Sequence, residues 1–494
     1  MLAYIKTKPV LDEFAMTPKL SLTCLLLFSS AAFASGVEAT KHLPYGSRSA
    51  QLIAPLSAPE QPLIADNTDQ FFPPASTLKV VTALAAKLAL PESFRFETTL
   101  YTSGNDLIIH YSGDPTFSRE SLRNMLKQAK SEVGARFNNI WLDNSVFSGY
   151  ERGVGWPWDI LGVCYSAPAS AITLDGNCVQ GALYTNSNGS TRINIPSHQP
   201  IIATTSAKTV SKQNQEQTHC DLELEVSPNN QYTLSGCAVE RKSPLPLKFA
   251  LSSPEQFTVD VIKSELQRLG VILSGEVKVG TPNIKSQHPL FVQRSRPLND
   301  LLAVMLKDSN NLYADNITKT LGATYYKKPG SFNNGTEAIK AILKEQAGID
   351  LELAVLEDGS GLSRNNRVTA NQMQQVLSYI HQNDSALKLA RLMPVSGNNG
   401  TLKYRSSMRK APIKGALVAK SGSLFGTYNM MGFGLGSRGE RESLFVQFVT
   451  DYHPKKSTTS QPVESPLTQY EKAYYRQIVD YSYSLERSNN KAQP

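Results

Sequence analysis

Ser76 and Lys79 are the residues whose types and spacing most clearly predict chemistry. They lie three positions apart at the start of an apolar run, directly after Pro73 and Pro74. Prolines suit the first turn of a helix, and side chains at i and i+3 share a helix face, so the amine can reach the hydroxyl. A serine hydroxyl becomes a good nucleophile when a neighbouring base takes its proton. The spacing therefore predicts a nucleophile with its own base at a helix N-terminus, where free N–H groups can hold a developing oxyanion.

The Ser-x-x-Lys pattern is weak evidence alone, because a match of two residue types recurs by chance. It occurs three more times in this chain: Ser385 with Lys388, Ser407 with Lys410, and Ser488 with Lys491. The Ser76 copy differs because two further motifs follow it in order, Ser309-x-Asn311 and Lys420-Ser421-Gly422. Such motifs in this order are typical of penicillin-binding proteins and class A β-lactamases.

The downstream motifs supply groups that a Ser76 nucleophile needs. For Lys79 to act as a neutral base near pH 7, its pKa must fall by roughly three units from about 10.4. Burial and a neighbouring cation both lower the pKa of a lysine, and we expect Lys420 to be that cation. Ser309 is expected to pass the proton to the leaving amine, and Asn311 to orient Lys79 and bind the substrate amide.

The strand that carries Lys420 is expected to bind the substrate backbone. Gly422 has no side chain and therefore lets the strand approach a substrate closely. We expect the N–H groups of Ser76 and Ser423 to form the oxyanion hole, and the hydroxyls of Ser421 and Ser423 to bind a terminal carboxylate.

Helices and strands from both ends of the chain must position these motifs. A helix over residues 76 to about 90 is predicted to carry the nucleophile, and two short strands precede it at 50–55 and 62–66. A polar kink at 309–311 separates two helical segments. Further helices are predicted at 298–307, 312–321, 335–347, 369–382 and 466–485, and antiparallel strands at 416–424, 428–435 and 443–450. The last helix carries a stripe that is expected to pack on the sheet rather than on a membrane surface: Tyr470, Tyr474, Ile478 and Tyr481.

Residues 94–289 have a different texture, with short alternating strands, polar turns and two clear helices at 118–133 and 254–269. A polar stretch at 204–218 is predicted to be a mobile loop. We interpret 94–289 as a β-rich insertion of two subdomains within a catalytic domain formed by 35–93 and 290–485, followed by a tail at 486–494. The pattern of elements predicts an α+β fold with an antiparallel sheet flanked by helices, and the three ordered motifs resemble those of the serine β-lactamase/transpeptidase fold.

Composition and the N-terminus indicate an exported globular protein. The 494 residues are 40% hydrophobic, enough for a substantial core. An apolar run at 20–32, preceded by Lys19 and followed by Ala32-Phe33-Ala34, predicts a signal peptide cut after Ala34, with Met1 or Met16 as the start. Lys and Arg exceed Asp and Glu by eight. That excess suits an anionic envelope polymer, or at most peripheral membrane association, and no basic tract or stacking motif indicates nucleic acid.

Four cysteines remain after the predicted signal peptide, and an even number in an exported protein indicates two disulfides. Of the three possible pairings, the simplest joins neighbours in sequence: Cys164 with Cys178, and Cys220 with Cys237. No Cys-x-x-Cys occurs and the histidines are scattered, so neither a metal nor a cofactor is expected.

The chain resembles the class C low-molecular-mass penicillin-binding proteins of the D-alanyl-D-alanine carboxypeptidase/endopeptidase family. Segments along the whole mature chain carry this resemblance: Gly113-Asp-Pro-Thr116, Gly155-Trp-Pro-Trp158, Cys164-Tyr-Ser-Ala-Pro168, Asp358-Gly-Ser-Gly-Leu-Ser-Arg364 and Lys420-Ser-Gly-Ser-Leu424. The resemblance implies a periplasmic enzyme that cleaves D-Ala-D-Ala bonds or diaminopimelate-D-Ala cross-links in peptidoglycan stem peptides, and that β-lactams acylate at Ser76.

The resemblance also implies a pocket for the stem-peptide side chain, formed here by Asp159, Tyr165 and Arg364. Two positions at this pocket depart from the family pattern. Asp159 lies one residue before the position of the family's acidic residue, and Phe425 stands where a polar residue is usual. Two alternatives stay open. A serine β-lactamase shares the acylation step, but no Glu-x-x-Leu-Asn segment is present to position a deacylating water. A non-catalytic peptidoglycan-binding protein on the same fold is the other.

Overall fold

The computed structural model describes residues 37–283, 288–454 and 464–491. The predicted signal peptide and both candidate start residues lie outside these ranges. Within them, none of the helices is both long enough and apolar enough to cross a membrane.

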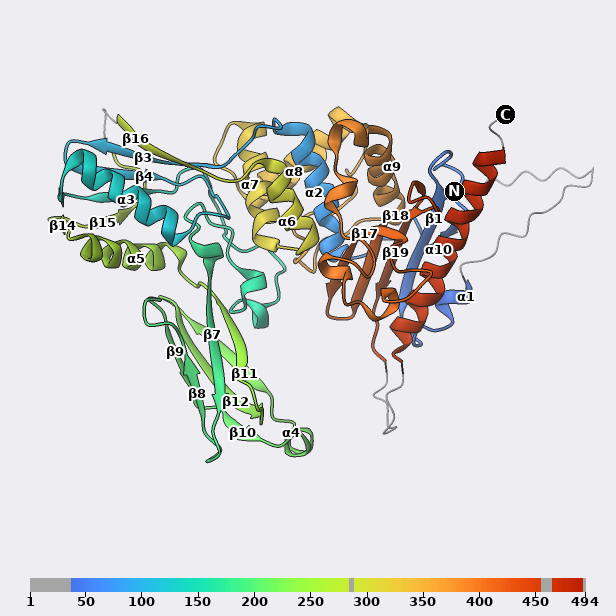
Figure 1. Ribbon diagram of the computed structural model, residues 1–494, viewed down its shortest axis with the longest axis horizontal. Helices are drawn as coiled ribbons and strands as arrows, with labels where there is room; N and C mark the ends of the chain where they lie inside the picture. Colours follow the sequence, from blue (N-terminus) through green and yellow to red (C-terminus); the bar gives the residue numbers. More distant parts are fainter. Residues whose placement is uncertain (1–36, 284–287, 455–463, 492–494) are drawn as a thin grey trace, which may run out of the picture. The chain divides into compact units, whose positions relative to one another are not determined.

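The α+β class is confirmed by a five-stranded antiparallel sheet that is covered by helices on both faces (Figure 1). Alternation along its strands separates two cores, since Leu52 and Val446 pack with one set of helices, and Ile53 and Phe445 with another. The strand order is β17 (Leu417–Leu424), β18 (Thr427–Leu435), β19 (Arg441–Thr450), β1 (Arg48–Pro55) and β2 (Ile64–Asp66). The predicted strands agree with these within a few residues.

Helix α10 (Pro466–Lys491) covers one face of this sheet, as the Tyr stripe predicts. Tyr470, Tyr474 and Ile478 are fully buried, and the Tyr474 hydroxyl donates to the backbone oxygens of Leu52 and Val446. The helix continues past the predicted end at residue 485. A short helix, α1 (Val37–Thr40), contacts it.

Helices cover the other face of the sheet, and among them are the two that carry Lys79 and Asn311. A single 3₁₀ turn, η1 (Ala75–Thr77), leads into the first of them. The helices are α2 (Leu78–Ala89), α6 (Leu298–Lys307), α7 (Asn311–Tyr326), α8 (Phe332–Ala347) and α9 (Ala370–Leu387). Their apolar faces form the largest core, which lies directly behind the nucleophile turn.

A second five-stranded sheet lies within the predicted insertion. Its order is β15 (Val277–Val279), β6 (Ile140–Asp143), β4 (Asp106–His110), β3 (Glu97–Ser103) and β16 (His288–Arg294), with the two-stranded pair β5 (Arg136–Phe137) and β14 (Ile272–Leu273) beside it. Strand β16 runs across the predicted boundary at residue 289 and pairs with β3. We therefore propose that the insertion ends after Arg294.

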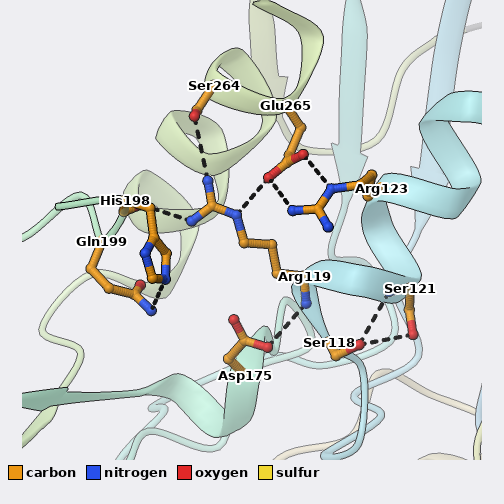
Figure 2. A network of polar contacts seen from close by, with 9 residues as sticks. All are labelled: Ser118, Arg119, Ser121, Arg123, Asp175, His198, Gln199, Ser264 and Glu265. Atoms are coloured by element: carbon orange, nitrogen blue, oxygen red, sulfur yellow. Dashed lines mark hydrogen bonds and ion pairs between the residues drawn. The ribbon is translucent and has the colours of Figure 1, made fainter. Parts of the chain in front are cut away.

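Two helices that pack with this sheet, α3 (Arg119–Val133) and α5 (Pro254–Leu269), are joined by a buried cluster of charges (Figure 2). The Glu265 carboxylate accepts from Arg119 at 2.6 Å and from Arg123 at 2.7 Å. The hydrogen bond from Arg123 is the main cause that lowers the pKa of Glu265 to about 2, and Arg119 adds to it. The carboxylate is therefore ionised and holds the two helices together.

The remaining strands of the insertion form two smaller sheets with both disulfides beside them. The strands are β7 (Cys178–Thr185), β8 (Thr191–Asn194) and β13 (Leu245–Ala250) in one sheet, and β9 (Ile202–Thr205), β10 (Lys208–Val210), β11 (Leu222–Ser227) and β12 (Gln231–Val239) in the other. Disulfides join Cys164 to Cys178 and Cys220 to Cys237, the pairing of neighbours in sequence.

The prediction of a mobile loop at 204–218 is wrong. Strands β9 and β10 both pair in parallel with β12, and helix α4 (Lys212–Thr218) follows with Ser211 as its N-cap. The side chains of this segment are mostly exposed, so its composition is polar although its backbone is paired. Hydrophobic patterning cannot detect strands of that kind.

Candidate active site

The nucleophile turn is held in a strained conformation. Ala75 has a φ of 48°, in the left-handed region that non-glycine residues rarely adopt, and Ser76 follows it half-buried. Gly361, itself at φ 79°, packs so tightly on this turn that a Cβ there would lie 1.8 Å from the Ala75 carbonyl oxygen. The helix begins at Leu78, so Ser76 lies in the preceding 3₁₀ turn rather than in the first turn of α2, where it was predicted. Residues in sparsely populated conformations often mark functional sites.

Lys79 is fully buried and points its amine at Ser76. Its Nζ donates to Ser76 Oγ at 2.8 Å, to Asn311 Oδ1 at 2.6 Å and to the Ser360 carbonyl at 2.6 Å. Burial lowers the pKa of Lys79 to about 8, and the charge of Asp315 opposes this. About a tenth of Lys79 is therefore neutral at pH 7, far more than for a free lysine, and a general base needs this neutral form. Burial, rather than the neighbouring cation that the sequence suggested, is the main cause of this low pKa.

Lys420 on β17 forms a second buried amine next to Ser309. Its Nζ donates to Ser309 Oγ at 2.8 Å and to the Ser421 carbonyl at 2.7 Å. Burial, and then the charge of Lys79, hold the pKa of Lys420 well below its usual range. Ser309 has a φ of 58°, so the kink between α6 and α7 turns sharply at this residue.

Asn311 links the two sides of the site. Its Oδ1 accepts from Lys79, while its Nδ2 donates to the Tyr165 carbonyl at 2.7 Å. Tyr165 lies in a 3₁₀ turn, η3 (Cys164–Ser166), which the Cys164–Cys178 disulfide ties to β7. One amide side chain therefore connects the base to a loop of the predicted insertion.

Strand β17 lies against the nucleophile turn at Gly422. A Cβ at Gly422 would lie 2.8 Å from the Pro74 carbonyl oxygen and 3.0 Å from the Ser76 nitrogen. Ser421 is buried and its hydroxyl bonds Thr401 Oγ1 at 2.9 Å, whereas Ser423 is exposed on the same face of the strand. The strand edge and the nucleophile are thus as close as glycine permits.

The predicted side-chain pocket brings together three exposed residues. Burial is the main cause that raises the pKa of Tyr165, Asp159 also raises it, and Arg364 lowers it, so all three lie within electrostatic range. The guanidinium of Arg364 is 6.0 Å from the ring centre of Phe425. Phe425 is 77% exposed, so an apolar surface borders this charged group.

Sequence reasoning missed several polar groups that hold the site together. The Ser360 carbonyl binds Lys79, Thr401 bonds Ser421, and the Asn429 amide donates to the carbonyls of Pro73 and Pro74. The sequence marks the 358–364 segment as part of the family resemblance but indicates a role only for Arg364. Asn429 was detectable, because it faces Gly422 across an antiparallel pair that the sequence predicts. Within the described ranges, no group of three or more metal-binding side chains is present.

Comparison with known proteins decides the family. Residues 38–473 match the D-Ala-D-Ala carboxypeptidase 3 (S13) family. The chain belongs to this carboxypeptidase family. The D-alanyl-D-alanine carboxypeptidase DacB of Haemophilus influenzae is 36% identical over 455 residues, which cover 90% of this chain and 93% of the relative. A D-alanyl-D-alanine carboxypeptidase of an Actinomadura species is 26% identical over 80% of this chain and 76% of its own length.

Solved structures agree with this carboxypeptidase assignment. Penicillin binding protein 4 (dacB) of Haemophilus influenzae superposes with a TM-score of 0.82 and 34% identity, over 90% of this chain and 99% of that protein. A structure of the same Haemophilus protein in complex with a β-lactam gives a TM-score of 0.78. The transpeptidase-like fold with a long insertion is therefore confirmed for this carboxypeptidase family member.

Proposed function

We propose that this chain is a serine DD-peptidase that forms an acyl-enzyme on Ser76. The observation that carries the proposal is the buried Lys79 amine, which donates to Ser76 Oγ at 2.8 Å and has a pKa of about 8. The named activity of the Haemophilus and Actinomadura relatives, D-alanyl-D-alanine carboxypeptidase, supports the same conclusion.

Acylation begins when neutral Lys79 takes the Ser76 proton and Oγ attacks the carbonyl carbon of the D-Ala-D-Ala bond. The tetrahedral oxyanion is held by backbone N–H groups of Ser76 and Ser423. The C–N bond then breaks, and the Ser309 hydroxyl, which lies 2.8 Å from the Lys420 amine, acts as a relay: it gives its proton to the leaving D-alanine nitrogen and receives in turn the proton that Lys79 took from Ser76. Water hydrolyses the ester on Ser76 and restores the hydroxyl. In a diaminopimelate-D-Ala cross-link the amide also follows a D-alanine carbonyl, so it can react in the same way with the diaminopimelate amine as the leaving group.

The substrate is expected to lie along β17. The hydroxyls of Ser421 and Ser423 suit the terminal carboxylate of D-alanine. Arg364 and Asp159 carry opposite charges and suit the carboxylate and ammonium of a diaminopimelate side chain, with Tyr165 between them. The apolar ring of Phe425 at this pocket is expected to change the preference among stem peptides.

We propose that the protein acts in the periplasm, on the stem peptides of peptidoglycan. Export rests on the predicted signal peptide and on the two disulfides, since disulfides persist in oxidising compartments. β-Lactams mimic the D-Ala-D-Ala terminus and are expected to acylate Ser76.

The test is covalent labelling with a fluorescent penicillin. The mature protein is expected to bind one label per chain, and Ser76→Ala and Lys79→Ala to lose labelling. Ser385→Ala is the matched control, because Ser385 belongs to another Ser-x-x-Lys pattern but is exposed on α9. Lys420→Ala is expected mainly to weaken substrate capture. Labelling that persists in Ser76→Ala would refute the assignment.

Two further assays separate the alternatives. Incubation with purified sacculi, followed by mass analysis of the products, distinguishes release of D-alanine from cleavage of cross-links, and a protein that only binds sacculi releases neither. Rapid repeated hydrolysis of nitrocefin would instead indicate a β-lactamase.

A further inference from the structure

A buried carboxylate lies behind Lys79 and has no role in the mechanism so far described. Asp315 is on α7, one helical turn after Asn311, and its side chain is fully buried. Its Oδ1 accepts the backbone N–H groups of Gly359 at 3.1 Å and Ser360 at 2.9 Å. Its Oδ2 makes no hydrogen bond within the described residues. A buried carboxylate oxygen without a partner is costly, so its retention calls for a reason.

The neighbouring Asp358 differs from Asp315, because both of its carboxylate oxygens have hydrogen-bond donors. Its Oδ1 accepts from Gly361 N and Asn366 Nδ2, and its Oδ2 from Ser363 N and Trp156 Nε1. All four contacts shape the turn at 358–363. Asp358 is therefore saturated with donors, whereas Asp315 keeps one oxygen unused.

Asp315 holds in place the residue whose carbonyl binds the catalytic lysine. The N–H of Ser360 points to Asp315 and the carbonyl of Ser360 accepts from Lys79 at 2.6 Å. On the other side, Thr82 Oγ1 donates to the Gly359 carbonyl at 2.7 Å. A Cβ on Gly359 would lie 1.7 Å from Thr318 Oγ1, so the turn has no room to move toward α7.

The reaction places a full positive charge in this dry region. When Lys79 takes the Ser76 proton, the resulting ammonium is buried, and a buried ion without an opposite charge is strongly disfavoured. The carboxylates that act on Lys79 are Asp315 and Asp358. Because Asp358 is already shared among four donors, Asp315 retains more of its capacity to stabilise a new cation.

We propose that Asp315 is a positioning residue of the acylation step: it holds the Ser360 carbonyl against Lys79, and its carboxylate stabilises the ammonium that forms there. The inference rests on the proposed function, since it assigns a partner to the base of that reaction. No proton needs to pass between Asp315 and Lys79, because the carboxylate acts through its charge.

Other charged groups face this pair and must be included in any pH argument. Lys420 approaches from β17, Asp358 from the 358–363 turn, and Lys319 lies one turn further along α7. Burial, and then the charge of Asp358, raise the pKa of Asp315, while the Lys79 ammonium opposes that rise. Asp315 is thus ionised most readily while Lys79 carries its proton.

The test is the pH dependence of penicillin acylation in Asp315→Asn. The amide keeps an oxygen that can accept the two N–H groups but removes the charge. Without the charge, Lys79 loses its proton more easily, so the acid limb of the acylation rate is expected to move about one pH unit lower. The plateau rate is expected to fall about tenfold, because a weaker base takes the Ser76 proton less well.

Controls separate this role from a merely structural one. Asp143→Asn removes another buried carboxylate, on β6, and is expected to leave the acid limb in place. Asp315→Glu keeps the charge and is expected to retain the wild-type acid limb even if its plateau rate is lower. It also serves as the test should Asp315→Asn not fold by circular dichroism.

An unmoved acid limb in folded Asp315→Asn, or a shifted one in Asp315→Glu, would overturn the proposal. Failure of the proposed function is distinguishable from either result, because wild-type protein would then not be acylated at Ser76 at any pH.

Discussion

Replacing Gly422 by alanine is expected to slow acylation of Ser76 strongly while lowering the stability of the fold only moderately. The added Cβ would lie 2.8 Å from Pro74 O, 2.9 Å from Thr77 N and 3.0 Å from Ser76 N. These distances are roughly 0.5 Å or more short of the separation of about 3.5 Å at which such atoms pack. All three atoms belong to the backbone of the nucleophile turn, so β17 and that turn must move apart.

The magnitude follows from how steeply catalysis depends on position. A displacement of 1 Å can cost about a hundredfold in rate, so a displacement of half that size at Ser76 is expected to slow acylation by about tenfold or more. The same overpacking is expected to lower the free energy of unfolding by about 1–3 kcal/mol. A large effect on rate should thus accompany a moderate effect on stability.

The assay is the second-order rate of labelling by fluorescent penicillin, with thermal unfolding measured on the same samples. Gly189→Ala is the control, because its φ of 79° strains an alanine while nothing lies within 4 Å of the added Cβ. It is expected to cost about 1 kcal/mol of stability and to acylate normally. A folded Gly422→Ala protein that acylates within about threefold of wild type would refute the close packing of β17 on the nucleophile turn.

Three further results are expected. The rate of acylation should rise about tenfold per pH unit below the Lys79 pKa of about 8 and level off above it, as measured by labelling across pH. Glu265→Gln should destabilise the protein by about 2 kcal/mol at neutral pH, and because Arg123 holds the pKa of Glu265 near 2, thermal unfolding should show this difference shrinking as pH falls from 4.5 toward 2. Joint replacement of Cys220 and Cys237 by serine should cost about 3 kcal/mol locally, seen as faster proteolysis of the insertion, with labelling unchanged.

Helices and strands with periodic apolar residues could be predicted from the sequence. Strands whose side chains are mostly exposed could not. Helices α5 and α6 and the three strands β17 to β19 follow from apolar patterning and turn residues. Strands β9 and β10 do not, because their side chains are largely exposed and their pairing with β12 depends on residues about 29 positions away. The later boundary that we propose for the insertion has a related basis, since β16 joins a sheet whose other strands come from the insertion.

For the site, the sequence predicted which side chains meet but not what holds them. Lys79, Ser309, Asn311 and Lys420 are recognisable because each belongs to a short motif with a chemical reason for its spacing. The Ser360 carbonyl is a backbone group. Because every residue has such a carbonyl, residue type cannot predict which one binds Lys79. Its position depends on tertiary packing of the 358–363 turn against α2 and α7, which only the structure reveals.

The same packing distinguishes the two buried lysines of the site. Lys79 and Lys420 are equally buried, and each contacts a serine hydroxyl at 2.8 Å, so neither burial nor the length of that contact distinguishes them. Their neighbours do: carboxylates oppose the effect of burial at Lys79, whereas at Lys420 the charges of Lys79 and Arg405 add to it. In the proposed mechanism, Lys79 can therefore hold the proton that it would take from Ser76, and Lys420 is kept from becoming a second cation beside it. The electrostatic difference between two similar amines thus follows from carboxylates on α7 and on the 358–363 turn, more than two hundred positions along the chain from Ser76.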